Sequence, residues 1–194
     1  MQAQQRDDCI FAPTNIICDE NEAGLEESFQ VSAHNAGRAM VREIRVVFTS
    51  AVGGGSTDEF VIVQVMQRAQ VDITLLGDAQ EREKDRLLER FVDWAKRFVE
   101  RLSVDGSWAD YCDPCSGLPW FSDGNVVYSE VEGASRTLGY ATRSVDVAGG
   151  IGACSVLVHP EWGGAVYPTT VFTNASPEAV CEAIQATPVV VAEQ

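Results

Sequence analysis

The sequence predicts an α+β domain in which a mixed, mainly antiparallel β-sheet is packed by one long helix and a few short ones. One observation is the segment 79–106, where apolar residues recur at helical spacing. A second is the β-branched run 59–67, whose apolar residues fill both faces of an extended strand. The third is the order of strands, one long helix, several strands and a short helix, which lacks the regular alternation of a parallel sheet.

The length of the chain indicates one domain. A chain of 194 residues can bury a core without disulfide bonds. We predict a domain over residues 9–187, with tails at 1–8 and 188–194. The six cysteines are an even number, but the start of the chain lacks an export signal, so free thiols are expected.

The charge excludes two classes of partner. The chain has 14 basic and 29 acidic residues and a formal net charge of -15, which repels nucleic acid and anionic membrane surfaces. No apolar run approaches the roughly 18 residues that span a bilayer, and "MQAQQRDD" resembles no targeting segment. We expect a cytoplasmic protein, with a mitochondrial pool if a targeting segment is missing here.

The first half of the chain is legible from residue 41 onward, whereas the pattern before it is too mixed to assign. We expect a strand at 41–49, a loop at 50–57, the interior strand at 59–67 and then the long helix. Gly106 is a natural end for that helix. Its core-facing residues are predicted to be Leu87, Leu88, Phe91, Val92, Ala95, Phe98, Val99 and Leu102.

The second half is rich in glycine and predicts three strands and a final helix. The strands are expected at 125–131, 153–159 and 165–175, separated by turns such as "EGASR" and "VAGGIG". Ser176 is the expected N-cap of the last helix, with Pro177 at its first position.

Cys112 and Cys115 form a Cys-x-x-Cys pair, which is compatible with thiol redox chemistry, a metal site or a turn. A redox cysteine needs the start of a helix that follows a strand, whereas this pair follows a helix. Zinc would need two further ligands, and the chain has only two histidines, His34 and His159. "DPCSG" favours a turn.

Cys154 is the cysteine best placed to meet a ligand. It follows the glycine run 148–152, which lacks the third glycine of a dinucleotide-binding loop and leads into a strand. A small buried residue is the alternative. His159 is five residues away on the same strand and faces the opposite side, so no Cys–His dyad is expected.

Four blocks in order resemble the methylmalonic aciduria and homocystinuria type D (cobalamin D) family of vitamin B12 trafficking. They are "WADYCDPCSGL" (108–118), "RTLGY" (136–140), "IGACSVLVHPEWG" (151–163) and "VFTNASPE" (171–178). With fainter similarity upstream, the resemblance covers most of residues 8–180.

The resemblance implies a nitroreductase-like fold that has lost flavin binding and has no enzymatic activity, hence no catalytic residues and no metal site. It implies an adaptor that docks onto the cobalamin C processing protein and helps deliver cobalamin to methionine synthase and methylmalonyl-CoA mutase, with methionine synthase as a further partner. The cobalamin would be shared with the partner, because the chain lacks the Asp-x-His-x-x-Gly pattern of B12 enzymes and is not expected to hold it tightly.

The resemblance also implies a role for Cys154. In the family, a cysteine of the loop corresponding to "IGAC" ligates the cobalt of partner-bound cobalamin, and a thiolate suits a polarisable metal. Cys154 is therefore the implied ligand. The family loop has two adjacent cysteines and uses the first, a position that Ala153 occupies here. Neighbouring strand residues face opposite sides, which would turn Cys154 away from the family direction.

Two further departures from the family pattern concern other regions of the chain. The family turn is "DPSSG", without Cys112 and Cys115, and the segment 32–57 resembles an insertion.

Two rival functions stay open. One rival is a flavin-dependent nitroreductase-like reductase, against which stands the lack of Arg/Lys clusters for a flavin phosphate. The other is a thiol oxidoreductase that uses Cys112 and Cys115.

Overall fold

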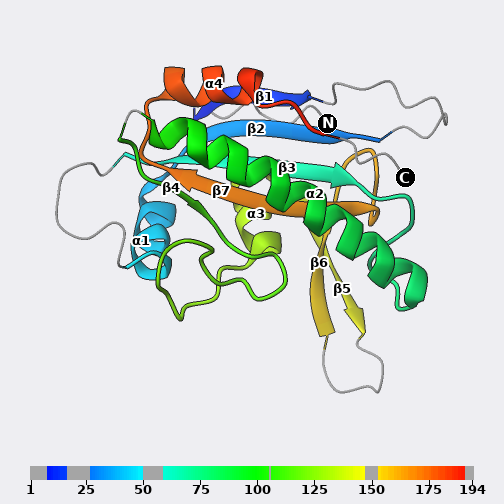
Figure 1. Ribbon diagram of the computed structural model, residues 1–194. Helices are drawn as coiled ribbons and strands as arrows, with labels where there is room; N and C mark the ends of the chain where they lie inside the picture. The colour runs from blue at the N-terminus through cyan, green and yellow to red at the C-terminus, as the bar shows by residue number, and fades with distance from the viewer. Residues whose placement is uncertain (1–7, 17–26, 50–58, 105, 147–152, 191–194) are drawn as a thin grey trace.

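A five-stranded sheet in the order β1-β2-β3-β7-β4 forms the centre of the molecule (Figure 1). This computed structural model describes residues 8–16, 27–49, 59–104, 106–146 and 153–190. All neighbouring strands of the sheet are antiparallel. The strands are β1 (Cys9–Asn15), β2 (Phe29–Asn35), β3 (Val61–Arg68), β4 (Ala109–Tyr111) and β7 (Val166–Thr173). The α+β class and the antiparallel sheet are confirmed.

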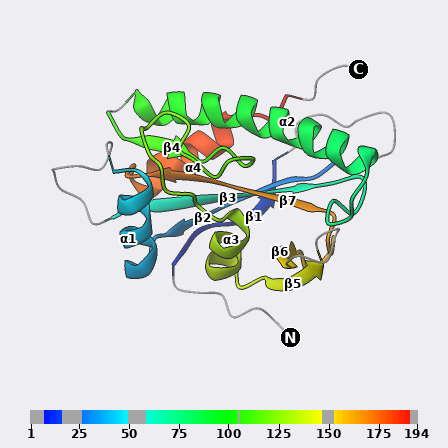
Figure 2. The same cartoon turned by 90° about the horizontal axis from the view of Figure 1, so that it is seen from below.

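Helices cover both faces of the sheet. On one face lie α2 (Asp78–Ser103) and α4 (Pro177–Ala186), and on the other lie α1 (Arg38–Val47) and α3 (Glu130–Leu138) (Figure 2). In the part of the chain that the structure describes, no helix is both long enough and apolar enough to cross a membrane.

Strand β3 confirms the interior strand predicted at 59–67. Val61, Val63 and Val65 pack toward α2 and α4, whereas Ile62 and Met66 pack toward α1 and α3. Alternate residues of a strand face opposite sides, so a run that is apolar on both faces stabilises two layers at once.

Helix α2 confirms the long helix predicted at 79–106. Its buried side chains include Leu87, Phe91, Trp94 and Phe98, at separations of three or four residues. Trp94 is fully buried, and its indole Nε1 donates a hydrogen bond of 3.0 Å to the carbonyl of Thr187. This bond ties α2 to the end of α4.

The predicted strand at 41–49 is wrong, because these residues lie mainly in α1. The β-branched composition of this segment favoured a strand. Met40, Ile44 and Val47 are buried at spacings of four and three residues, which places them on one helical face against the sheet. Packing of that face outweighed the local propensity.

The predicted strand at 125–131 is also wrong, since it has no strand partner among the described residues and leads into α3. The turn predicted at 132–136 lies within that helix, where Ser129 accepts the amide hydrogen of Glu132 as N-cap. Gly133 belongs to this helix instead of a turn, and a Cβ atom there would lie 1.7 Å from the hydroxyl of Tyr128.

Residues that the sequence left unassigned form one edge strand of the sheet and the strand next to it. They include β1 and β2, and β2 pairs with both β1 and β3. The segment 32–57, which resembles an insertion, therefore supplies half of a central strand and all of α1. The predicted loops at 50–57 and 147–152 and most of the two tails lie outside the described residues. Val189 is 2% exposed and packs beside α4, so ordered packing continues past the predicted boundary at 187.

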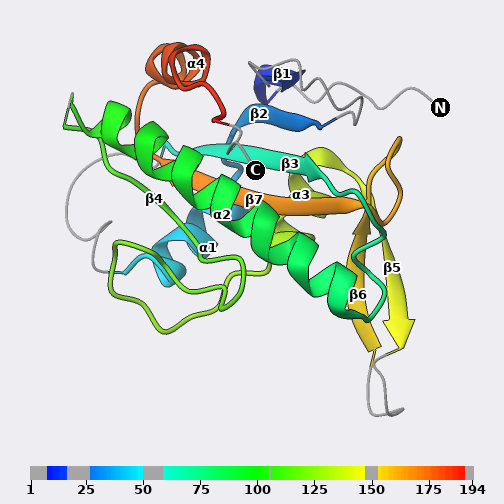
Figure 3. The same cartoon turned by 45° about the vertical axis from the view of Figure 1, so that its right-hand side comes forward.

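A separate two-stranded hairpin projects from the body of the protein. It consists of β5 (Ala141–Asp146) and β6 (Ala153–Val158), which pair antiparallel. The hairpin leaves the plane of the sheet on the side that carries α1 and α3 (Figures 1 and 3). The predicted strands at 153–159 and 165–175 are confirmed as β6 and β7.

Candidate functional site

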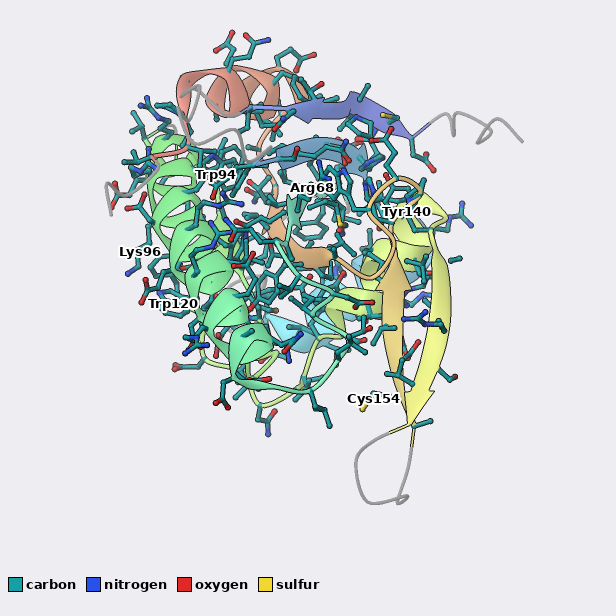
Figure 4. All side chains as sticks on the ribbon, turned by 90° about the vertical axis from the view of Figure 1, so that its right-hand side faces the viewer. Arg68, Trp94, Lys96, Trp120, Tyr140 and Cys154 are labelled. Carbon is teal, nitrogen blue, oxygen red and sulfur yellow. The ribbon has the colours of Figure 1, made fainter. Side chains whose placement is uncertain are left out.

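Cys154 lies near the far end of the projecting hairpin. It is the second residue of β6, and its Cα partner is Val145 of β5. Figure 4 shows Cys154 at the end of the hairpin remote from Tyr140, which lies at its root. The thiol is exposed. The alternative of a small buried residue is therefore wrong, and the sulfur is open to another molecule.

The two faces of β6 have different surroundings. Leu157 and His159 are both 3% exposed and face the core beneath α3, and Ala153 shares their face by strand alternation. Cys154 lies on the other face. Cys154 and His159 therefore point to opposite sides of the strand and form no dyad within it.

Three aromatic rings hold the root of the hairpin. His159 stacks on Trp162 with ring centroids 3.8 Å apart and planes 13° apart, and Tyr140 meets His159 edge-on at 5.2 Å. The backbone of His159 exchanges hydrogen bonds of 2.9 and 3.0 Å with Gly163, which closes the turn after β6. Burial lowers the pKa of His159, although Glu161 opposes that shift.

A second tie reaches the hairpin from the loop before α2. Arg143 of β5 donates a hydrogen bond of 3.2 Å to the hydroxyl of Thr74. The hydroxyl and amide of Thr74 in turn donate to the carboxylate of Asp72, at 2.5 and 3.0 Å. These bonds to Thr74 lower the pKa of Asp72. They link the exposed strand β5 to the protein body.

The Cys112 and Cys115 pair forms the predicted turn. Asp113 accepts the backbone amides of Cys115 and Ser116, at 3.1 and 3.2 Å, and Gly117 closes the turn with a positive φ of 71°. Cys112 is fully buried beneath α1, whereas Cys115 is exposed.

Neither thiol of this pair is activated. Burial, aided by the carboxylates of Glu130 and Asp110, raises the pKa of Cys112. Partial burial and Asp113 raise the pKa of Cys115. A thiol oxidoreductase needs the opposite shift, because the thiolate is the nucleophile. The five cysteines that the structure describes are all free thiols.

Metal chemistry has no support in the described part of the chain. No group of three or more His, Cys, Asp or Glu side chains there could hold a metal ion. The two histidines lie in separate places, since His34 is on β2 beside Ser32 and His159 is at the hairpin root.

A cavity of about 270 Å³ lies between the start of α1 and the end of α3. Its lining includes Arg38 and Arg136, the kind of residues that a flavin phosphate would need. However, Arg136 forms an ion pair of 2.6 Å with Glu43, and the volume falls below the roughly 300–1,000 Å³ typical of small-molecule sites. The cavity therefore does not favour the flavin-dependent rival.

One buried polar cluster was missed by sequence reasoning. Glu130, the first residue of α3, accepts a hydrogen bond from the hydroxyl of Thr170 on β7, and Gln64 on β3 donates to that hydroxyl at 3.2 Å. Burial raises the pKa of Glu130 to about 8. Glu130 resembles an ordinary helix-start carboxylate in sequence, so only the three-dimensional packing reveals it.

Comparison with known proteins gives a consistent family. The family model described as "Methylmalonic aciduria and homocystinuria type D protein" matches residues 14–185. The chain is 34% identical over 137 residues to the protein named "Cobalamin trafficking protein CblD" of Homo sapiens, which covers 70% of this chain and 44% of that protein. The proteins of that name from Rattus norvegicus and Gallus gallus are 34% and 32% identical over the same coverage.

The chain spans about 44% of the length of the curated relatives it matches. The family model nevertheless covers strands β2, β3, β4 and β7 of the sheet, all or nearly all of each of the four described helices, and the described part of the hairpin with Cys154. The chain therefore belongs to the methylmalonic aciduria and homocystinuria type D protein family.

Proposed function

We propose that this chain is a non-enzymatic adaptor of cobalamin trafficking. It would bind the cobalamin C processing protein and help deliver the cofactor to methionine synthase and methylmalonyl-CoA mutase. Family membership and the names of the relatives support a trafficking role. The observation that carries the proposal is the exposed Cys154 near the end of a hairpin that projects from the protein body.

The geometry suits a thiol that works in the site of another protein. An exposed sulfur at the end of a two-stranded arm can enter a partner's cleft while the sheet and helices remain outside. In this proposal Cys154 donates its thiolate to the cobalt of partner-bound cobalamin, which is a reasonable pairing of a soft ligand with a polarisable metal. The chain itself would hold no cobalamin tightly, so the cargo is shared.

The lack of catalysis is part of the proposal. We infer a nitroreductase-like ancestry in which flavin chemistry has been lost. Two observations support this inference: the raised pKa values of Cys112 and Cys115, and the small volume of the cavity beside Arg136. Neither place offers an activated group with room for a substrate.

We also propose a cytoplasmic location with a mitochondrial pool, which fractionation of tagged full-length protein would test.

The test is a pull-down of the cobalamin C protein with this chain, with and without cobalamin. We expect a complex, and we expect cobalamin to strengthen it in the wild type more than in Cys154→Ala. Cys115→Ala is the matched control, since it removes the other exposed thiol that the structure describes. Failure to form a complex under either condition would contradict the adaptor function.

A further inference from the structure

His159 holds the turn at the root of the hairpin through its side chain as well as its backbone. The imidazole Nδ1 accepts the backbone amide hydrogens of Glu161 and Trp162, at 3.2 and 3.3 Å. The carbonyl of Tyr140, at the root of the other strand, accepts the hydroxyl of Ser135 on α3 at 2.8 Å. The ring of His159 therefore lies where both strands of the hairpin meet the protein body.

These hydrogen bonds define the protonation state of the ring. Because Nδ1 accepts two N–H groups, it carries no proton, and the neutral ring must carry its proton on Nε2. Nε2 is buried and has no hydrogen-bond partner among the described residues. A second proton would have to enter at Nδ1, directly opposed to both amide hydrogens, and would break the side-chain half of the turn.

The surroundings of the ring favour the neutral form of His159. The titratable neighbours are Tyr140, which meets the ring edge-on, and Glu161 in the turn itself. Burial keeps the pKa of His159 below its ordinary 6.5 despite the attraction of Glu161. Since the folded-state pKa is depressed, the interaction is complete above pH 6.5 and is lost as the pH falls through the folded-state value.

A small movement at this root is large at the thiol. His159 directly follows β6 and is five residues from Cys154, a separation of about 17 Å for an extended chain. A tilt of roughly 10° at the root would therefore displace the sulfur by about 3 Å, whereas a working site must hold its groups within roughly 0.5 Å. The order of the root controls whether Cys154 can reach a fixed point in a partner.

We propose that His159 is the positioning residue for the Cys154 thiol: its neutral ring fixes the hairpin on the protein body, and protonation of that ring releases the hairpin. The role in delivering the thiol rests on the proposed function, but the effect on the hairpin does not. The arrangement gives the thiol a fixed direction at neutral pH and an indefinite one in acid.

Two substitutions separate the acceptor role of His159 from its titration. In His159→Asn, the side-chain oxygen takes the place of Nδ1 and can accept the same two amides as an Asx turn, but it does not titrate. In His159→Leu, both hydrogen bonds are lost while the apolar volume is kept. His34→Asn is the matched control, because His34 is the other histidine of the chain and lies on β2.

Hydrogen exchange of the β5 and β6 amides, corrected for intrinsic rates, tests the proposal. We expect the wild type and His34→Asn to lose roughly tenfold protection between pH 7.5 and pH 5. His159→Asn should keep its protection at both values, and His159→Leu should be roughly tenfold less protected at both. The β3 amides should stay protected throughout.

Two results would overturn this assignment. One is a hairpin in His159→Leu that is as protected as the wild type at pH 7.5. The other is an acid loss in His159→Asn equal to that of the wild type, and this comparison remains decisive if His159→Leu does not fold. With cobalamin-loaded partner, the thiolate–cobalt absorption should follow the hairpin protection. Expected hairpin behaviour without any such absorption would contradict the cobalt chemistry and leave the positioning role standing.

Discussion

Thr170 on β7 donates its hydroxyl to the carboxylate of Glu130, which lies buried between α3 and the central sheet. The other carboxylate oxygen of Glu130 has no hydrogen-bond partner among the described residues, and neither has the hydroxyl of Tyr128. A charged carboxylate in such a place is costly, so Glu130 prefers to be protonated.

We predict that Glu130 makes the protein less stable as the pH rises. Its pKa is raised from 4.5 to about 8 on folding, so the folded state binds the proton more tightly. Stability falls between those two values by up to about 5 kcal/mol, and the loss is complete above pH 8. Glu130→Gln should remove this loss, as seen in urea unfolding at pH 5 and pH 9. An unchanged pH slope, equal to that of the surface control Glu132→Gln, would refute the prediction.

We predict that Gly133→Ala strongly destabilises the protein, although alanine favours helices elsewhere. A Cβ atom at this position would lie 1.7 Å from the Tyr128 hydroxyl, and Tyr128 is 2% exposed and edge-on to Phe172. Overpacking of a buried site costs about 1–3 kcal/mol or more. Thermal unfolding measures the effect, with the exposed Glu132→Ala in the same helix as control. Equal stability of the two variants would show that Tyr128 can move away.

Asp110 is predicted to anchor the loop after the Cys112 turn, which carries the exposed aromatic residues Trp120 and Phe121. It is fully buried, and its carboxylate accepts the amides of Tyr111, Phe121 and Ser122 at 2.8, 3.0 and 2.8 Å. Asp110→Ala leaves these amides without their acceptor and should cost about 3 kcal/mol or more.

The comparison variants for Asp110 sharpen this test. Asp110→Asn keeps one acceptor oxygen and should cost less, while Glu89→Ala on the surface of α2 should change stability by less than about 0.5 kcal/mol. Trp120 stacks on Tyr111 and lies beside Lys96 (Figure 4), so its fluorescence should report loosening of the loop in Asp110→Ala. An unchanged emission together with unchanged urea unfolding would contradict the anchor.

The cysteines are predicted to react with alkylating reagents in a defined order. Cys154 is exposed and should be modified first, whereas the raised pKa of Cys115 slows its reaction although it is also exposed. Cys112 is fully buried and should react only when the protein unfolds. Peptide mass mapping over time at pH 7.5 checks the order. Early modification of Cys112 would contradict the buried turn.

The elements that could be predicted from the sequence are those with a continuous apolar pattern or a local capping signal. The long helix α2 and the interior strand β3 bury continuous apolar patterns, and Ser176 and Pro177 signal the start of α4 through local hydrogen bonding. Helix α1 was mistaken for a strand because its residues favour strands locally, and only contact with the sheet at Met40 and Ile44 selects the helix.

The candidate site was only partly predictable for a similar reason. Strand alternation places Cys154 and His159 on opposite faces, which follows from their separation alone. The direction of the hairpin and the hydrogen bonds of His159 in the turn at its root depend on tertiary contacts. These contacts are made with Tyr140, Trp162 and α3. The raised pKa of Glu130 and the need for glycine at position 133 likewise depend on packing. Glu130 contacts Thr170 of β7, and Gly133 contacts the side chain of Tyr128.

The most direct test of the central claim is the absorption spectrum of cobalamin bound to the cobalamin C protein when this chain is added. We predict a thiolate–cobalt absorption change with the wild type and with Cys115→Ala, and none with Cys154→Ala. The double substitution Ala153→Cys with Cys154→Ala moves the thiol to the face of Leu157 and shows which face delivers it. A spectrum with Cys154→Ala equal to that of the wild type would contradict the account.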